Sequence, residues 1–505
     1  MNHQPRSPSN TEVSGRGRAS RCCGLLVALV LTGGLDAASG ATRAWLVAGE
    51  PDARIADSRS TATTLWVADT LRASAITQTF LADPTPDVLE IRPGPNGADS
   101  PTTLQPLARV FGQQAFNAVP VRRYRVSSTL AGARADMLSA ALDKDFGAMG
   151  PADRGLFFYA GPGTPDTTDA AGNTLRLWDN TGLAVRELDT LARHVPVNAP
   201  MRFVLTQCHS SGFQRLIRSG ARDQRSLGRH NRCVFTAEPV DRAGSVPRCS
   251  SGSADAGSEG NRDYAAQFFS ALSGRTRTGA ALPRSADLDG NRVITLHEAH
   301  LYAVIEGDGA ELPRASTETY LERWQPVWLR YLDTVSEPDN EYGQVARVLA
   351  ERLRLPLRGR ALVDALETRQ KDMAGRLDRL AEESRRVGAE TDRLQATLRR
   401  SLTQRWPAAA HPHTAGYARF LANDVAAAQN FLQAQTTTYP ALVAKQDRLA
   451  QIALERQALE RSLTQLDKLM RMRHLARVQA QFEQHASAQA RQDHARLASC
   501  EHTPL

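Results

Sequence analysis

The feature that most constrains the fold is a series of short apolar runs that alternate with helix-like segments. The runs read "RAWLVAG", "RGLFFYAGPG", "RFVLTQC" and "RCVFTAEP". Segments between them, such as "NTGLAVRELDTLARHV", carry apolar residues at helical spacing. Continuous apolar strands joined by helices are typical of a parallel sheet that is buried on both faces. We therefore predict an α/β domain over residues 42–335, with a mostly parallel sheet flanked by helices.

The character of the chain changes near residue 341, where long heptad repeats begin. Apolar residues at seven-residue spacing with charged flanks are typical of an α-helical coiled coil. We predict a first helical arm over residues 341–402, a loop over 403–417, a second arm over 418–490 and a tail over 491–505. The heptad positions include Leu366, Met373, Leu380, Val387 and Leu394 in the first arm, and Ile452, Leu459 and Leu466 in the second.

Two arrangements of the arms fit these heptads. The arms can form a protruding antiparallel hairpin, which also offers a region for self-association, or they can pack as a helical bundle on the first domain. Arg456 and Arg473 interrupt the apolar seam of the second arm. The zipper is therefore imperfect, and both arrangements stay open.

The amino-terminal segment has the order of a secretory signal. Arg16, Arg18 and Arg21 precede the apolar run "CCGLLVALVLTGG", and small residues follow in "DAASGAT". The run is short for a membrane span, so we predict a signal peptide over residues 1–41 and an exported protein. An uncleaved membrane anchor is the alternative. We expect contact with a membrane through this segment alone.

The net charge of +8 comes almost entirely from arginine, because the lysines are few: Lys144, Lys371, Lys445 and Lys468. Nucleic-acid binding needs a basic patch within a recognisable module. The positive charge here is spread along the chain without such a module. We therefore do not expect a nucleic acid as a partner.

Four cysteines follow the amino-terminal segment: Cys208, Cys233, Cys249 and Cys500. In an oxidising compartment, Cys233 and Cys249 can form a disulfide that closes a short loop. Four cysteines allow three complete pairings, so the sequence leaves the pairing open. If Cys208 carries out chemistry, it is the cysteine that we expect to stay free.

Two of the predicted strands end in residues that suggest a catalytic site. The first ends in the turn "AGPG", and the second ends at Cys208, before the small residues of "CHSSGF". Ligands of parallel sheets bind beyond the carboxyl ends of the strands. Over residues 43–323 the chain resembles the caspase–legumain group of cysteine peptidases, above all its bacterial legumain-like members. In that group one strand ends in His-Gly and the next in Cys.

The resemblance implies a caspase-like fold and assigns roles to particular residues. Cys208 matches the nucleophile, and Gly163 matches the glycine whose backbone N–H points at the developing oxyanion. The family's histidine is replaced by Pro162, which has neither a titratable group nor a backbone N–H. General acid–base groups contribute about 10²–10⁴-fold to a rate, so this replacement predicts impaired or absent proteolysis.

Two functions are consistent with this site. We favour a pseudo-peptidase that binds a peptide or protein and associates through its helical region. The alternative is an active cysteine endopeptidase in which another histidine replaces the missing base. His209, beside the nucleophile, is the candidate that we assign to the site, and His194 and His230 are further candidates. The imidazole must lie within hydrogen-bond reach of the sulfur.

A second motif, "DLDGNRVITLHE", places oxygen ligands at the positions of a twelve-residue calcium-binding loop. Ca²⁺ takes roughly six to eight oxygens, which a tight turn gathers around one centre. Arg292 occupies the sixth position, where the pattern requires Gly. The alternative is a turn that caps the next helix. The predicted site requires no cofactor, and Ca²⁺ is the metal that the sequence suggests. The predicted ligands are Asp287, Asp289, Asn291, Val293 (through its carbonyl), Thr295 and Glu298.

Overall fold

A computed structural model of the chain describes residues 40–50, 58–81, 88–91, 104–112, 122–125, 130–218, 226–239, 263–331, 337–411 and 414–505. The predicted signal segment falls outside these residues except for its last two positions. None of the helices that the structure describes combines the length and apolar character needed to cross a bilayer.

A seven-stranded sheet forms the centre of the fold, with strand order β12-β11-β10-β6-β1-β2-β5. Six neighbouring strands run parallel, and β12 pairs antiparallel with β11 at one edge. The prediction of an α/β domain with a mostly parallel sheet is confirmed. The strands are β1 (Thr42–Ala48), β2 (Ile76–Leu81), β5 (Leu130–Gly132), β6 (Arg154–Ala160), β10 (Met201–Leu205), β11 (Arg232–Pro239) and β12 (Glu311–Arg314).

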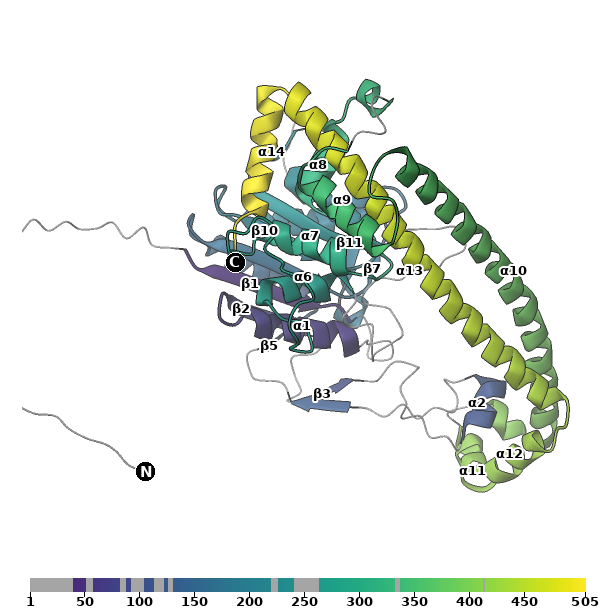
Figure 1. The fold of residues 1–505 in the computed structure, drawn as a ribbon. Coiled ribbons are helices and arrows are strands. Elements are labelled where there is room, and N and C mark those ends of the chain that lie inside the picture. The colour runs from purple at the N-terminus through teal and green to yellow at the C-terminus, as the bar shows by residue number, and fades with distance from the viewer. Residues whose placement is uncertain are drawn as a thin grey trace, which may run out of the picture. The chain divides into compact units, whose positions relative to one another are not determined.

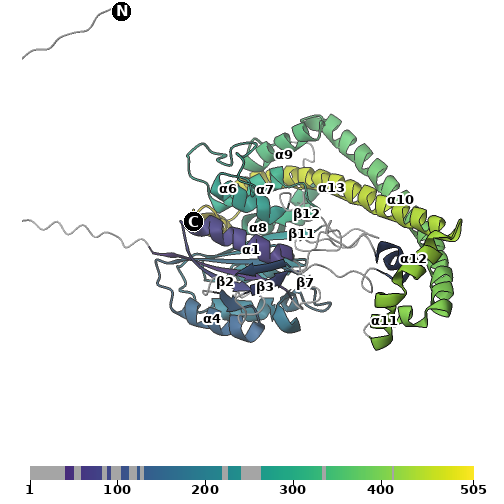
Figure 2. The ribbon, with the colours of Figure 1, turned by 90° about the horizontal axis from the view of Figure 1, so that it is seen from below.

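Helices cover both faces of the sheet, which explains why its strands are continuously apolar. Along β6, Phe157 and Tyr159 belong to a core shared with the helices of one face, and Leu156 and Phe158 belong to the core of the other face. In Figure 2, α4 lies on one side of the sheet, and α1, α6 and α7 lie on the other. The helices are α4 (Ala135–Gly147) and α5 (Val185–Ala192) on the first face, and α1 (Ser58–Leu71), α6 (Tyr264–Ser273) and α7 (Leu296–Glu306) on the second.

Two small sheets accompany the main one. Strands β7, β8 and β9 form a three-stranded antiparallel sheet directly after β6, and β3 pairs antiparallel with β4. Their bounds are β3 (Val88–Ile91), β4 (Arg122–Arg125), β7 (Gly163–Thr164), β8 (Thr174–Arg176) and β9 (Gly182–Ala184).

Two long helices, α10 (Gly359–Arg405) and α13 (Thr438–His485), run antiparallel along one another (Figure 1). The Arg448 guanidinium donates to both Glu383 oxygens at 2.8 Å, and Gln370 of α10 contacts Asp467 of α13 at 3.3 Å. The described carboxyl-terminal half is thus a helical hairpin with shorter helices at both ends. These are α8 (Ser316–Trp324) and α9 (Glu341–Arg352) at the base, α11 (Ala415–Asn423) and α12 (Val425–Gln433) at the tip, and α14 (Ala488–Glu501) after α13.

The hairpin tip carries a separate apolar cluster that includes a helix from the first half of the chain. Leu107 and Val110 of α2 (Gln105–Phe111) pack with Leu398 of α10 and Phe420 of α11. The side chains of Gln395 and Gln446 both donate to the Arg109 carbonyl at 2.8 Å. The predicted loop and second arm therefore need correction, because residues 407–433 mostly fold into short helices that bury this cluster.

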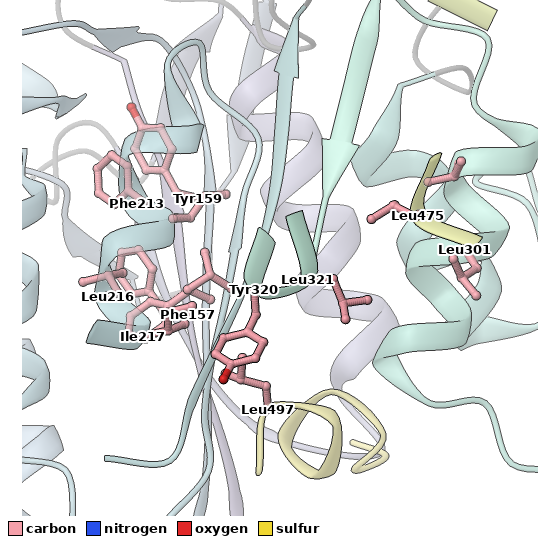
Figure 3. Close-up of a cluster of buried hydrophobic side chains, with 14 of the residues drawn as sticks. Phe157, Tyr159, Phe213, Leu216, Ile217, Leu301, Tyr320, Leu321, Leu475 and Leu497 are labelled. Carbon is pink, nitrogen blue, oxygen red and sulfur yellow. The ribbon is translucent and has the colours of Figure 1, made fainter. Parts of the chain in front are cut away.

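The base of the hairpin packs on the α/β domain. Leu475 of α13 belongs to the same buried cluster as Leu301 of α7 and Leu321 of α8, as Figure 3 shows. The structure therefore combines the two predicted arrangements, because the arms pair with one another and one of them also docks on the first domain.

Charged residues of α13 bind the domain at this junction. The Arg471 guanidinium donates to Glu318 at 2.7 Å, to Glu322 at 3.0 Å and to the Pro313 carbonyl at 3.1 Å. The Lys468 ammonium donates to the Gly307 carbonyl at 2.6 Å, and burial lowers its pKa to about 8. Arg473, which interrupts the predicted heptad seam, is buried and donates to Glu337 at 2.9 Å.

The carboxyl terminus is not a tail, which corrects the prediction for residues 491–505. Helix α14 lies against the domain, and Cys500 and Glu501 are completely buried. Cys500 forms a disulfide with Cys233 of β11, across a sequence separation of 267 residues. Cys233 is therefore not paired with Cys249, which was one of the pairings that the sequence left open. The disulfide therefore joins the carboxyl-terminal helix to the sheet, and it does not close a short local loop.

The buried ion pair at the junction predicts the effect of removing one partner. Replacing Arg471→Ala leaves Glu318 buried without its guanidinium, and such changes cost about 3–5 kcal/mol of unfolding free energy. Arg448→Ala is the matched control on the same helix, since its pair with Glu383 is partly solvent-exposed and exposed pairs contribute little. Urea unfolding of both variants measures the difference. Equal losses would show that the junction does not depend on this pair.

Candidate functional site

The two strands of the predicted site are neighbours, and their carboxyl ends lie side by side at one end of the sheet. Strands β6 and β10 are parallel neighbours with Tyr159 opposite Leu205. Thr206 continues the pairing, since its backbone N–H and its hydroxyl both donate to the Tyr159 carbonyl, at 3.1 and 3.0 Å. The turn after β6 and the turn that carries Cys208 are therefore at the same level of the sheet.

Gly163 lies directly against the Cys208 turn. A Cβ atom at Gly163 would lie 2.2 Å from the Cys208 carbonyl oxygen and 2.7 Å from Gln207 Cγ. Contacts this short cannot be relieved while both turns keep their positions. Glycine is required here by close approach, and the structure brings together the two residues that the sequence singled out.

Pro162 is held by its carbonyl group, which accepts the Arg176 backbone N–H at 3.0 Å. The buried Tyr159 hydroxyl lies 2.8 Å from the Pro162 carbonyl oxygen and 2.6 Å from the Arg176 carbonyl oxygen, between which its one proton is shared. Burial raises the pKa of Tyr159 well above its usual value, so the hydroxyl stays protonated as a donor. The turn is thus fixed from both sides, and Pro162 offers no proton acceptor other than its carbonyl oxygen.

Asn173 links the two turns, and sequence reasoning missed it. Its side-chain amide donates to the His209 carbonyl at 2.9 Å, and its side-chain oxygen accepts the Asp166 backbone N–H at 3.0 Å. Asp166 forms a local turn by accepting from the hydroxyl and backbone N–H of Thr168, at 2.6 and 2.8 Å. Only the turn-forming composition of this segment could have signalled such a bridge.

Two of the three candidate bases lie at the opposite end of the sheet, where the parallel strands begin. His194 follows α5 and precedes β10, so it is at the amino ends of the parallel strands, where its ring contacts Asp143 at 2.7 Å. His230 precedes β11, beside Asn231, which donates its N–H to the Val197 carbonyl at 2.9 Å. Burial, together with Arg232 and Arg229, lowers the pKa of His230. Neither ring is positioned to serve Cys208.

His209 stays at the carboxyl edge because it is next to Cys208 in the chain. Its backbone has a φ of 59°, the left-handed conformation that a non-glycine residue seldom adopts. Its carbonyl is bound by Asn173, as described above. This conformation turns the chain sharply after Cys208 and into the helical turn Ser210–Arg218.

Cys208 itself is disulfide-bonded, and its partner lies outside the described residues. The expectation that a working Cys208 stays free is therefore not met in this state of the protein.

Two side chains close to Cys208 in the chain were also missed by sequence reasoning. Within the described part of the chain, both amide atoms of Gln207 and the Ser210 hydroxyl are buried without a hydrogen-bond partner. Their only sequence signal is their position beside Cys208.

The predicted calcium loop brings three of its carboxylates together. One oxygen each from Asp287, Asp289 and Glu298 lie within 4.8 Å of one another. Asp287 accepts the backbone N–H groups of Gly290 and Arg292, at 2.7 and 2.9 Å. Arg292 has a φ of 68°, so it adopts the left-handed turn that the motif assigns to Gly.

The remaining predicted ligands are engaged within the loop or in capping a helix. The Asn291 side-chain oxygen accepts the Val293 N–H at 2.7 Å. Thr295 caps α7 by accepting the Glu298 N–H at 3.1 Å, and the Glu298 carboxylate accepts the Thr295 N–H at 2.9 Å. The capping role that the sequence offered as the alternative is therefore present, together with the carboxylate cluster.

Comparisons with known proteins identify no family. No protein-family model matches the chain, and no curated protein does. Among solved structures, it is similar to protein GSU0716 from Geobacter sulfurreducens, with a TM-score of 0.30 and 10% sequence identity, over 55% of this chain and 92% of that one. We infer neither fold nor function from a similarity of this size.

Proposed function

We propose that the chain is an exported relative of the caspase–legumain cysteine peptidases whose proteolytic activity is impaired or lost, and that it binds a peptide or protein at the former active site. The proposal rests first on the two neighbouring strand ends. Gly163 and the backbone of Cys208 are in close contact, so the residues that the resemblance assigns as oxyanion-binding glycine and nucleophile are neighbours in space.

The observation that carries the loss of activity is where the candidate bases lie among the described residues. Pro162 stands at the histidine position, while His194 and His230 belong to the amino edge of the sheet. A thiol without a base is only a few per cent ionised at neutral pH, and it has no group to protonate a leaving amine. The disulfide at Cys208 removes the nucleophile as well.

Peptide binding is supported by the buried polar atoms beside Cys208. The Gln207 amide offers one donor group and one acceptor, as a peptide unit does, and Ser210 offers a hydroxyl. Leaving such groups buried and unpaired costs about 1–3 kcal/mol each. Because Gln207 and Ser210 are completely buried, a peptide group pairs with them only if the turn at Cys208 opens.

Self-association through the helical region stays a prediction. The heptad side chains Leu366 and Met373 are already buried within the chain, so association would use the outer faces of the hairpin.

Export is supported by the cysteines. The Cys233–Cys500 disulfide and the bonded state of Cys208 are typical of proteins from oxidising compartments. This agrees with the signal segment expected at the amino terminus.

A thiol-reactive peptide probe separates the binding protein from an active peptidase. We expect the full chain, after reduction, to react at Cys208 no faster than free cysteine at pH 7, since general-base activation is absent. Cys208→Ser is the control for labelling elsewhere, and His209→Ala tests the one candidate base at this edge. Labelling that is much faster than that of free cysteine and depends on both Cys208 and His209 would establish the active endopeptidase instead.

We also propose that the loop from Asp287 to Glu298 binds Ca²⁺ as a structural ion. The carboxylates of Asp287, Asp289 and Glu298 supply hard oxygen ligands, and the left-handed turn at Arg292 gathers them.

Calorimetric titration of the full chain with CaCl₂ tests this proposal. Asp289→Asn removes one charge from an exposed ligand, and we expect it to weaken binding at least tenfold. Asp308→Asn is the control outside the loop. Absence of binding, or equal binding by Asp289→Asn and the native chain, would leave the loop as a helix cap only.

A further inference from the structure

Three helix ends meet at a second cluster of metal-ligating side chains, remote in sequence from Cys208. His297 is in the first turn of α7, Glu341 begins α9, and His502 caps the end of α14. One ligand atom from each of the three lies within 4.8 Å of the others. The rings of His297 and His502 are 4.7 Å apart between centroids and nearly perpendicular, at 79°.

The two nitrogens of His297 face two different carboxylates. Its Nε2 lies 3.1 Å from a Glu341 oxygen, and its Nδ1 lies 3.2 Å from a Glu501 oxygen. Glu501 is completely buried and fixed in place, because it accepts the Thr317 backbone N–H at 2.9 Å and the Thr317 hydroxyl at 2.6 Å. Glu501 therefore fixes the orientation of the His297 ring through Nδ1, and this orientation directs Nε2 to Glu341.

This arrangement matches the surroundings of a histidine that binds a metal. Such a histidine donates its second ring N–H to a carboxylate, which fixes the tautomer and makes the ligating nitrogen more basic. Two imidazoles and one carboxylate form a donor set that Zn²⁺ uses with a fourth position left to water. We propose that His297, Glu341 and His502 bind a divalent transition-metal ion of the Zn²⁺ type, with Glu501 orienting His297.

Distances and exposure are compatible with this site. Ligand atoms around a tetrahedral Zn²⁺ are about 3.4 Å apart, and those of the cluster lie within 4.8 Å of one another, so closing the cluster needs a movement of about 1.4 Å at most. His502 can supply that movement because it is exposed. The Glu341 side chain is 37% exposed, which leaves a solvent side for entry of the ion and for a water ligand.

Charge and donor type favour a transition metal over other cations. Glu341 and Glu501 bring two negative charges to a largely buried ring, and one divalent ion balances both. Ca²⁺ and Mg²⁺ prefer oxygen ligands, whereas imidazole nitrogens suit Zn²⁺ and its neighbours. The site is therefore chemically distinct from the oxygen-lined loop that immediately precedes α7.

The ligating imidazole nitrogens must be unprotonated to bind a metal, so we expect the affinity to fall as the pH is lowered. Because the three ligands come from α7, α9 and α14, the ion fastens the carboxyl-terminal helix to the domain.

Calorimetric titration of the EDTA-treated full chain with ZnCl₂ tests the proposal. We expect one Zn²⁺ per chain, and at least a tenfold loss of affinity in each of two variants, His502→Ala and Glu341→Gln. His502 is exposed, so its variant is expected to keep the melting temperature of the metal-free native protein. His411→Ala, at an exposed histidine of the hairpin tip, and Asp289→Asn, in the calcium loop, are controls that should bind Zn²⁺ like the native chain.

Three results would overturn this site. One is a native chain that binds no Zn²⁺. Another is binding that survives both His502→Ala and Glu341→Gln unchanged, which would place the ion elsewhere. A loss of affinity in Asp289→Asn equal to that in His502→Ala would assign the ion to the calcium loop.

Discussion

The close approach of two strand ends is the constraint on which the candidate site depends. Because β6 and β10 are parallel neighbours in register, the turns that follow them must share a small volume at the carboxyl edge. The contact between Gly163 and the Cys208 carbonyl leaves no room for a side chain, and Asn173 ties the two turns together. Backbone packing therefore holds the two turns together, whatever side chain stands at position 162.

A second set of interactions holds the carboxyl-terminal half on the domain. Arg471 is the most informative residue, because a buried guanidinium is costly unless several acceptors surround it. Glu318, Glu322 and a backbone carbonyl do so. The Cys233–Cys500 disulfide adds a covalent link from the last helix to the sheet. The helices of the carboxyl-terminal half and the sheet therefore belong to one folded unit. This unit contains residues 40–505.

Local patterns predicted the parallel sheet well, because a strand buried on both faces must be apolar along its whole length. The strand Arg232–Pro239 has the predicted bounds. What sequence reasoning missed are contacts between distant segments. The pairing of Cys233 with Cys500, and of α2 with the hairpin tip, depends on how the elements pack, and no local pattern records it. Likewise, the heptad pattern makes Arg473 a defect in a zipper, although in the structure it donates to Glu337, just before α9.

We propose that a histidine is the missing part of this site, and replacing Pro162 tests the proposal most directly. The measurement is the alkylation rate of Cys208 by iodoacetamide at pH 7 in the reduced full chain, followed by peptide mapping. We predict that Pro162→His reacts about tenfold faster or more than Pro162→Ala, because a nearby imidazole raises the thiolate fraction. Equal rates for Pro162→His and Pro162→Ala would contradict the account, since Pro162 would then not occupy the position of the base.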